Sequence, residues 1–288
     1  MMDRPLDIAV QQSAANSTEI ATFGERRFGT VNWLGLWTLY VKEVRRFMKV
    51  MTQTVVAPVV TTLLYLLVFN FAIGASRPAI DGVSFVVFLT PGLIMMAVLT
   101  NAFTNSSSSI LIGKVQGNIV DVLMPPLSPA ELTVAFVAGA ATRGLLVGFI
   151  TGVTGAVFIS YTGTGMVIEA LWAVFYFSTV AALIFAMLGV LGGIWAEKFD
   201  NIAAVTNFII MPLTFLSGTF YSIKRLPEPF QIVSHFNPVF YLIDGFRYGF
   251  LGCADSNLAI GVALTAGLVI ALAISCYLLF RSGYKLKD

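Results

Sequence analysis

Apolar residues in this chain form long runs separated by short polar segments, unlike the short apolar runs of a soluble core. A run of about 20 apolar residues lets an α-helix cross about 30 Å of hydrocarbon. The predicted spans, whose ends are approximate, cover residues 54–74, 84–105, 131–160, 168–195, 202–221 and 257–281. The pattern therefore predicts an all-α polytopic membrane protein with six transmembrane helices.

Composition agrees with this prediction, because 57% of the residues are hydrophobic and only 11% are charged. Soluble domains carry about 25% charged residues, so this chain has too few polar side chains to cover a surface that faces water. We find no basic surface interleaved with aromatic residues, so a nucleic-acid partner is not expected.

Residues 31–50 precede the first span and have the spacing of an amphipathic helix. One predicted face holds Trp33, Trp37, Tyr40, Val44, Phe47 and Met48, and the other holds Thr38, Lys42, Arg45 and Lys49. Tryptophan with lysine and arginine, Arg46 included, favours a helix in the headgroup plane. A soluble helix packed on a partner is the alternative. Residues 1–30 are expected to form a polar cytoplasmic tail.

The connection 106–130 predicts a short helix from Ile110 to Met124. We expect Ser106–Ser109 to cap its start, and Pro125, Pro126 and Pro129 to stop it. An ordinary connector helix would explain why this element exists, but not why three prolines follow it.

The connection 222–256 is long and unusually apolar and aromatic, so exposing it to water would create a large apolar patch. We predict two short outer helices, divided at Asn237-Pro238, that enter the membrane from outside and return without spanning it.

Most Lys and Arg residues of the connections fall on the side that both termini share when the span number is even. Positive charge favours the cytoplasm. The termini are therefore expected in the cytoplasm, with the connection 106–130 on the same side.

No catalytic motif is present. The segment around Gly113-Lys114 does not match the P-loop motif, because Val115 follows it where Ser or Thr is required and Ser108 stands where the first glycine is needed. The single histidine, His235, and the scattered carboxylates provide no metal-ligand cluster. The spans lack the Asp, Glu and His chains of proton-coupled carriers. If the chain transports, its energy must come from elsewhere.

Arg143 is the one clear charge within an apolar run. It has two interpretations, a structural pairing or a contact with an anionic lipid or substrate. Near it, Gly144, Gly148 and Gly152 recur every fourth residue and predict a tight helix contact, within one chain or between two.

Four motifs resemble the ABC-2-type permease family. They are Pro212–Ser222 with Leu226-Pro227, Asn237–Gly249, Arg143-Gly144, and Asp121-Val122-Leu123 before Pro125 and Ser128-Pro129. The resemblance covers roughly residues 30–285 and implies a transmembrane domain at 31–285. It also implies a homodimer in a bacterial inner membrane that works with two copies of a separate ATPase. ATP and Mg would bind that partner, with no cofactor on this chain.

The resemblance also implies roles for particular residues. The ATPase-coupling candidates are Lys114, Gly117, Asp121, Leu123, Met124 and Pro125. The translocation-route candidates in spans one and five are Thr61, Tyr65, Phe69, Thr214, Phe215, Phe220 and Tyr221. The candidates of the outer re-entrant segment are Asn237, Pro238, Tyr241, Asp244 and Arg247.

We therefore expect the permease subunit of an ATP-driven exporter for an amphipathic, lipid-linked or hydrophobic substrate, such as a lipid, glycolipid, polysaccharide or drug. The alternatives are a membrane-embedded lipid-modifying enzyme and a facilitator that works without an ATPase. Membrane lipids are expected partners in each case.

Overall fold

The computed structural model describes residues 31–71, 83–161, 165 and 168–286. The predicted tail 1–30 lies outside these residues. The chain divides into a unit ending at Asn32 and a compact unit that starts at Trp33, and only the second is described below. All regular elements in the described ranges are helices, and six are long and apolar enough to cross a membrane.

The helices follow one another in the order that hydropathy predicts, with some different ends. The first half of the unit contains α2 Trp33–Met48, α3 Met51–Phe69, α4 Phe85–Val115, α5 Ile119–Leu123, α6 Pro129–Tyr161 and α7 Leu171–Trp195. The fifth span is composite, with α8 Phe199–Val205, the π-helix η3 Thr206–Ile210 and α9 Met211–Leu216. The 3₁₀-helix η4 Ile223–Arg225, α10 Glu228–Phe236, α11 Pro238–Leu251 and α12 Leu258–Ser282 complete the unit.

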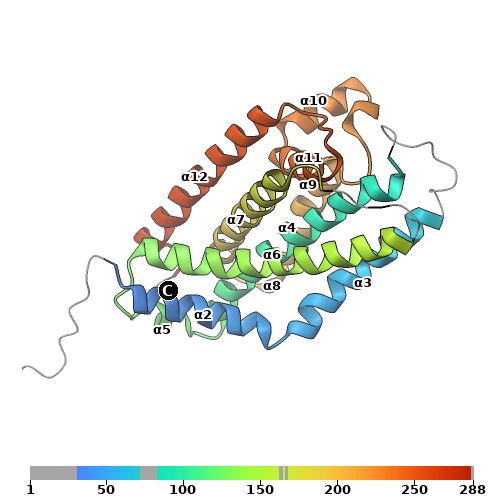
Figure 1. The fold of residues 1–288 in the computed structure, drawn as a ribbon. Helices are drawn as coiled ribbons and strands as arrows, with labels where there is room; N and C mark the ends of the chain where they lie inside the picture. Colours follow the sequence, from blue (N-terminus) through green and yellow to red (C-terminus); the bar gives the residue numbers. More distant parts are fainter. Residues whose placement is uncertain (1–30, 72–82, 162–164, 166–167, 287–288) are drawn as a thin grey trace, which may run out of the picture. The chain divides into compact units, whose positions relative to one another are not determined.

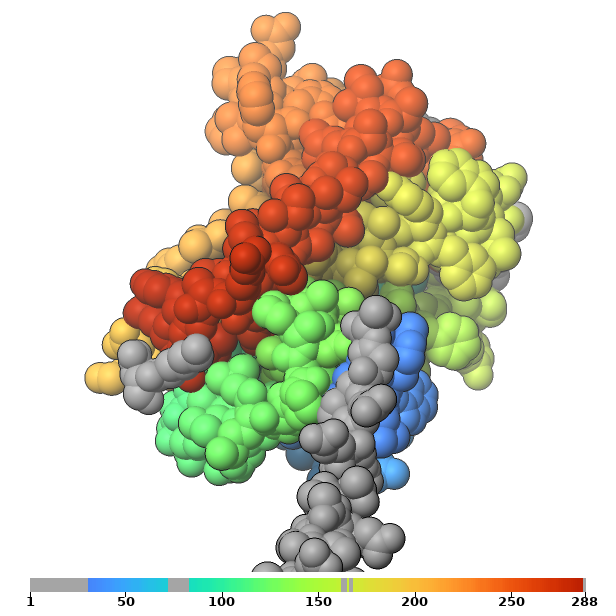
Figure 2. Space-filling model, turned by 90° about the vertical axis from the view of Figure 1, so that its left-hand side faces the viewer, coloured from blue at the N-terminus to red at the C-terminus, as the bar shows by residue number. Residues whose placement is uncertain are grey.

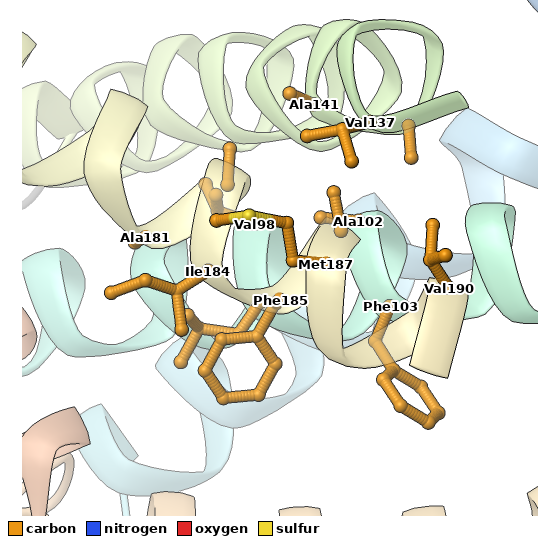
Figure 3. Close-up of a cluster of buried hydrophobic side chains, with 14 of the residues drawn as sticks. Val98, Ala102, Phe103, Val137, Ala141, Ala181, Ile184, Phe185, Met187 and Val190 are labelled. Atoms are coloured by element: carbon orange, nitrogen blue, oxygen red, sulfur yellow. The ribbon is translucent and has the colours of Figure 1, made fainter. Parts of the chain in front are cut away.

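α4 is the central helix, because 89% of its most apolar window is buried, against at most 50% for the other candidate spans. Its two main neighbours are α7 and α6. Figure 3 shows Val98 and Phe103 of α4 among side chains of α6 and α7, including Val137 and Phe185. The N-terminal half of α4 is almost entirely apolar, which suits a helix that is covered on all sides.

Glycines allow the close approach of helices to α4. A Cβ on Gly144 would lie 3.0 Å from both the Ala102 Cβ and the Val98 carbonyl oxygen. A Cβ on Gly148 would collide with a Val98 methyl group. The glycine repeat therefore has a contact within the chain, one of the two alternatives that the sequence leaves open.

The two ends of the helical unit carry different elements. Figure 1 shows α2 and α5 at one end, here called the α5 end, and α9, α10 and α11 at the other, here called the α11 end. Figure 2 shows α12, in red, crossing one face between the orange segment that holds α10 and the green segment that holds α5 and the start of α6.

The predicted cap at Ser106–Ser109 is wrong. α4 runs unbroken through these serines to Val115, and the short helix that follows is only α5. Instead of capping a helix start, Ser106 donates its hydroxyl hydrogen to the Ala102 carbonyl at 3.2 Å and to the Ala186 carbonyl of α7 at 2.8 Å. A serine inside a helix can satisfy its hydroxyl on the preceding turn.

Two further expectations are corrected. The fifth span does not continue to residue 221 as a helix, because α9 ends at Leu216 and Gly218 then takes φ +76°. The face of α2 is rotated from the predicted one. Phe47 packs into the protein with Leu39 and Glu43, while Trp33 and Trp37 stay exposed.

Candidate functional site

The turn between α4 and α5 is built around Gly117. Its φ of +73° is strained for any residue with a Cβ. No heavy atom lies within 4 Å of the position that its Cβ would take. Backbone conformation, rather than packing, therefore requires glycine at this turn.

One face of α5 packs against the protein core, and the other face is exposed. Ile119 is buried, and Leu123 packs against the main core. Asp121 is exposed, and Met124 is 77% exposed. Among the predicted coupling residues, Leu123 therefore anchors the helix, while Asp121 and Met124 are available to a partner.

The connection from α5 to α6 is short and held at both ends. The Leu127 amide donates to the Pro125 carbonyl at 2.7 Å. Ser128 and Glu131 form a reciprocal capping box, in which the Ser128 amide donates to the Glu131 carboxylate at 2.7 Å and the Glu131 amide donates to the Ser128 hydroxyl at 3.3 Å. The S-x-x-E spacing is visible in the sequence and could have revealed this helix start.

Lys114 does not face away from the protein. Its ammonium donates to the carbonyl oxygens of Ile194 at 2.7 Å and Ala196 at 2.8 Å, at the C-terminal end of α7. A cation is favourable beside the free carbonyls that end a helix. The predicted coupling residue therefore joins α4 to α7.

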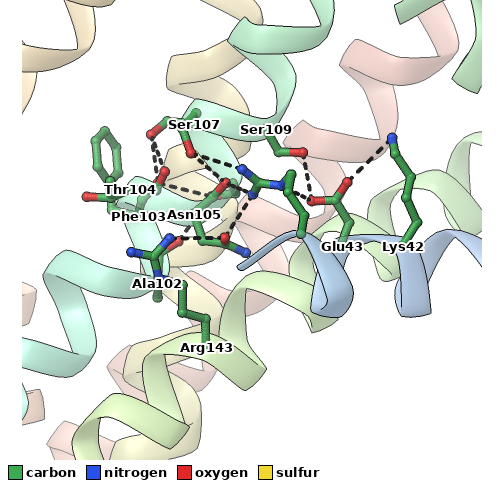
Figure 4. A network of polar contacts seen from close by, with 12 residues as sticks. Lys42, Glu43, Ala102, Phe103, Thr104, Asn105, Ser107, Ser109 and Arg143 are labelled. Carbon is green, nitrogen blue, oxygen red and sulfur yellow. Dashed lines mark hydrogen bonds and ion pairs between the residues drawn. The ribbon is translucent and has the colours of Figure 1, made fainter. Parts of the chain in front are cut away.

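A polar network joins α2, α4 and α6 (Figure 4). Arg46 donates to the Asn105 carbonyl oxygen at 2.7 Å and to its Oδ1 at 2.8 Å, and lies 3.3 Å from the Glu43 carboxylate. Glu43, although buried, also accepts from Ser109 at 2.7 Å. Arg143 reaches the same Asn105 Oδ1 at 3.4 Å.

Sequence reasoning missed Glu43 and Asn105. A signal for Glu43 was present, because it lies four residues from both Leu39 and Phe47 and so shares the inward face of α2. No sequence signal distinguishes Asn105 within its polar segment. Of the basic residues predicted to be interfacial, Arg45 and Lys42 stay largely exposed, whereas Arg46 belongs to the network.

The predicted route residues divide into two groups. Four aromatic rings from α3 and the end of the fifth span gather together. The ring centres of Tyr65 and Phe69 lie 5.7 Å and 5.5 Å from the ring centre of Phe220, and that of Phe215 lies 5.0 Å from it. Phe85 of α4 joins them 6.0 Å from Phe69, and was not predicted.

The other predicted route residues lie outside this aromatic group. Thr61 is exposed on α3, and Thr214 is buried with its hydroxyl bonded to the Ile210 carbonyl at 2.7 Å. The Tyr221 hydroxyl donates to the Phe215 carbonyl at 3.2 Å, and burial raises its pKa.

At the α11 end, the residues of the Asn237–Gly249 motif hold the connections together. Asn237 caps α11 by accepting from the Val239 amide at 3.0 Å and also donates to the Leu213 carbonyl at 2.8 Å. Pro238 occupies the first turn of α11, where a missing N–H costs nothing. Tyr241 is buried beside Phe240.

Two buried charges of α11 fix the neighbouring loops. Asp244 accepts from the amides of Asp255 at 2.9 Å and Ser256 at 2.8 Å. Arg247 donates to the Gly218 carbonyl at 2.7 Å, and its guanidinium lies 4.0 Å from the centre of the Phe88 ring. These residues therefore have a structural role in the described part of the chain.

Comparison with known proteins identifies the family. A family model described as "ABC-2 type transporter" matches residues 35–251. The chain is 37% identical over 256 residues to "Inner membrane transport permease YadH" of Escherichia coli (strain K12), with 89% of this chain and 98% of that protein covered.

More distant relatives match over nearly the same length. "Nodulation protein J" of Rhizobium leguminosarum bv. viciae is 27% identical over 256 residues, which is 88% of this chain and 95% of that protein. The protein of the same name from Rhizobium meliloti (strain 1021) is 25% identical over 252 residues, or 87% and 93%.

These matches indicate the function of the chain and the membrane in which it lies. The relative at 37% identity is named a transport permease of the inner membrane, which agrees with a multi-pass permease of that membrane rather than with the alternative of a lipid-modifying enzyme. The family implies association with an ABC ATPase, which disfavours the ATPase-independent facilitator. The chain belongs to the ABC-2 type transporter family, as a non-enzymatic membrane transport permease.

Proposed function

We propose that this chain is the membrane subunit of an ATP-driven exporter, in which two permease chains and two ATPase subunits assemble. The observation that carries the proposal is α5, a short helix with an anchored face and a presented face. Val120, Asp121 and Met124 are exposed on it, and Leu123 holds it to the core. This arrangement suits a docking element for a partner on the cytoplasmic side.

The connections around α5 support transmission of motion. The capping box at Ser128 and Glu131 fixes the start of α6 a short distance after α5, and Lys114 ties the end of α4 to α7. ATP binding would draw the ATPase subunits together and carry α5 with them. α4, α6 and α7 would then shift relative to the second protomer and open an outward route.

Exposed apolar faces support the homodimer. Leu64 and Val68 of α3, and Phe208 and Ile209 of η3, are exposed in the single chain. Phe208 is 81% exposed. Surface of this kind must face lipid or another helix, and the aromatic group of Tyr65, Phe69, Phe215 and Phe220 lies on α3, on α9 and in the loop that follows α9.

The substrate class follows from what would line such a route. Aromatic rings and sparsely charged spans favour an amphipathic, lipid-linked or hydrophobic molecule over a small ion. Sugars remain compatible, because aromatic rings can stack on them. We propose export, with both termini and α5 in the cytoplasm.

The proposal is tested by changing exposed residues of α5 and its end and measuring how well the permease recruits and stimulates the ATPase. Asp121→Lys and Met124→Gly should lower ATPase recruitment or stimulation several-fold while the permease still folds, because both side chains are exposed. A double change of Leu123 and Met124 to glycine should also loosen the anchor. Glu228→Lys, a charge reversal at an exposed site of α10, serves as the matched control.

Co-purification of the ATPase and its stimulated turnover in proteoliposomes are the measurements. The coupling role of α5 is wrong if both single variants recruit and stimulate the ATPase as the natural chain does. Accumulation of a labelled lipid in the leaflet that faces the ATPase, rather than in the opposite one, would overturn export.

A further inference from the structure

The junction of α2, α4 and α6 contains buried polar atoms that the described residues leave unpaired. Asn105 Nδ2, Arg143 Nε and Glu43 Oε1 have no hydrogen-bond partner within the described ranges. Asn105 is fully buried and Glu43 is 1% exposed. Glu43 Oε1 still has the Lys42 ammonium 3.7 Å away. Buried polar groups are normally satisfied, so the two unpaired donors, Asn105 Nδ2 and Arg143 Nε, call for an explanation.

The charges of the junction do not balance. Glu43 lies 3.3 Å from the Arg46 guanidinium and 3.7 Å from the Lys42 ammonium. Within the described part of the chain, no carboxylate forms an ion pair with Arg143. Glu43 therefore balances the charge of Arg46 but is not paired with Arg143, and a buried charge is costly unless it is paired.

Arg143 is held only weakly by the protein. Its two terminal nitrogens lie 3.4 Å from Asn105 Oδ1 and Asn101 Oδ1, which are neutral amide oxygens. Strong charge-assisted hydrogen bonds are shorter, about 2.7–2.9 Å. A planar guanidinium with spare donors is well matched to phosphate.

The amide of Asn105 is fixed in one orientation. Its Oδ1 accepts from Arg46 at 2.8 Å and from Arg143 at 3.4 Å, so Nδ2 points away from both bonds. Figure 4 shows Glu43, Asn105 and Arg143 meeting at the junction of their three helices. Asn105 is fully buried, whereas Arg143 is partly exposed, so the guanidinium of Arg143 is the part of this network that an anion from outside could reach.

We propose that this junction binds the phosphate of an anionic lipid headgroup, with the Arg143 guanidinium as donor and Asn105 as the residue that positions it. Arg143 is partly exposed, so a headgroup can reach it. α2 lies beside the site with Trp33 and Trp37 exposed, as expected for a helix at headgroup depth. Basic pockets between membrane helices bind anionic headgroups in this way. The proposal does not depend on the direction of transport.

The experiment uses the full chain with its ATPase in phosphatidylcholine nanodiscs, with or without added phosphatidylglycerol. Phosphatidylglycerol should raise the melting temperature of the natural chain, and native mass spectrometry should detect a retained lipid. Arg143→Gln should weaken lipid retention about tenfold or more. Arg281→Gln, which removes an exposed charge at the end of α12, should leave it unchanged.

Asn105→Asp is a second variant, which controls for the possibility that Arg143→Gln loses the lipid only because it misfolds. Its carboxylate would pair with both guanidiniums, so this chain should stay folded and lose its response to phosphatidylglycerol. The proposal is overturned if Arg143→Gln and Asn105→Asp both retain the lipid as the natural chain does. Equal stabilisation by inorganic phosphate in phosphatidylcholine nanodiscs would support the phosphate site but overturn the lipid as its source.

Discussion

The ammonium of Lys114 lies 2.7 Å from the carbonyl oxygen of Ile194, so the last turn of α4 is bonded to the last turn of α7. The two residues are 80 positions apart in the chain. Displacement of α5, which follows α4 after one turn, would therefore act on α7 as well. Lys114 joins two helices, whereas Asp121 and Met124 are exposed.

Lys114→Met should weaken this junction, because two hydrogen bonds from a charged donor are lost and the carbonyls of α7 are left without them. A hydrogen bond to a charged group contributes about 1.5–3 kcal/mol, so we expect a lower melting temperature and reduced ATPase stimulation. Lys198→Met, at an exposed position nearby, is the control. Unchanged stability and stimulation would show that the bond has no role.

Gly189→Ala should separate α7 from α4. The new Cβ would collide with the Ser106 hydroxyl oxygen and the Phe103 carbonyl oxygen, and the backbone oxygen cannot move without shifting α4. Overpacking of this kind costs about 1–3 kcal/mol. Gly267→Ala in α12 meets no atom within 4 Å and should be neutral or stabilising. Thermal unfolding of the two purified variants checks the contrast, and equal melting temperatures would contradict it.

Arg247→Lys should loosen the loop after α9. Lysine lacks the planar group that lies over the Phe88 ring and donates to the Gly218 carbonyl. Arginine and lysine are not equivalent at a stacked site. We expect faster proteolysis between Ser217 and Ser222, whereas Arg225→Lys at an exposed position should have no effect. If Arg247→Lys were cleaved there no faster than the natural chain, Arg247 would not be needed to hold this loop.

The contact of Glu197 with Lys285 should make the C-terminal turn sensitive to pH. The hydrogen bond from the Lys285 ammonium, at 2.8 Å, holds the pKa of the Glu197 carboxyl below its usual range. A lowered pKa in the folded chain means that the contact stabilises above the ordinary carboxyl pKa and is lost as pH falls through the folded value. The Glu197 side chain is largely solvent-accessible and Lys285 is partly so, and solvent therefore keeps the effect local.

Hydrogen exchange of residues 283–286, corrected for the intrinsic effect of pH, measures this change. Exchange should accelerate on acidification in the natural chain, and Glu197→Gln should exchange quickly at neutral pH with little further change. A natural chain whose corrected exchange is independent of pH would contradict the prediction.

The sequence by itself determined the membrane helices, since the length and apolarity of a run are local properties that fix whether a helix can span hydrocarbon. It also determined the division at Asn237-Pro238, because the Asn side chain and the proline ring act on neighbouring backbone. The motifs of the family were readable for the same reason. The exposure of Asp121 on α5 and the end of that helix before Pro125 needed no distant partner.

Only the tertiary structure decided what the polar residues inside the helices do. A serine hydroxyl can cap a helix, bond to the preceding turn or reach another helix, and Ser106 donates to the Ala186 carbonyl that α7 brings beside it. Glu43 is buried because α2 rests on α6, and Arg143 meets Asn105 because α6 crosses α4. Such partners lie far apart in the chain, and hydrogen-bond geometry selects them only after the helices have packed.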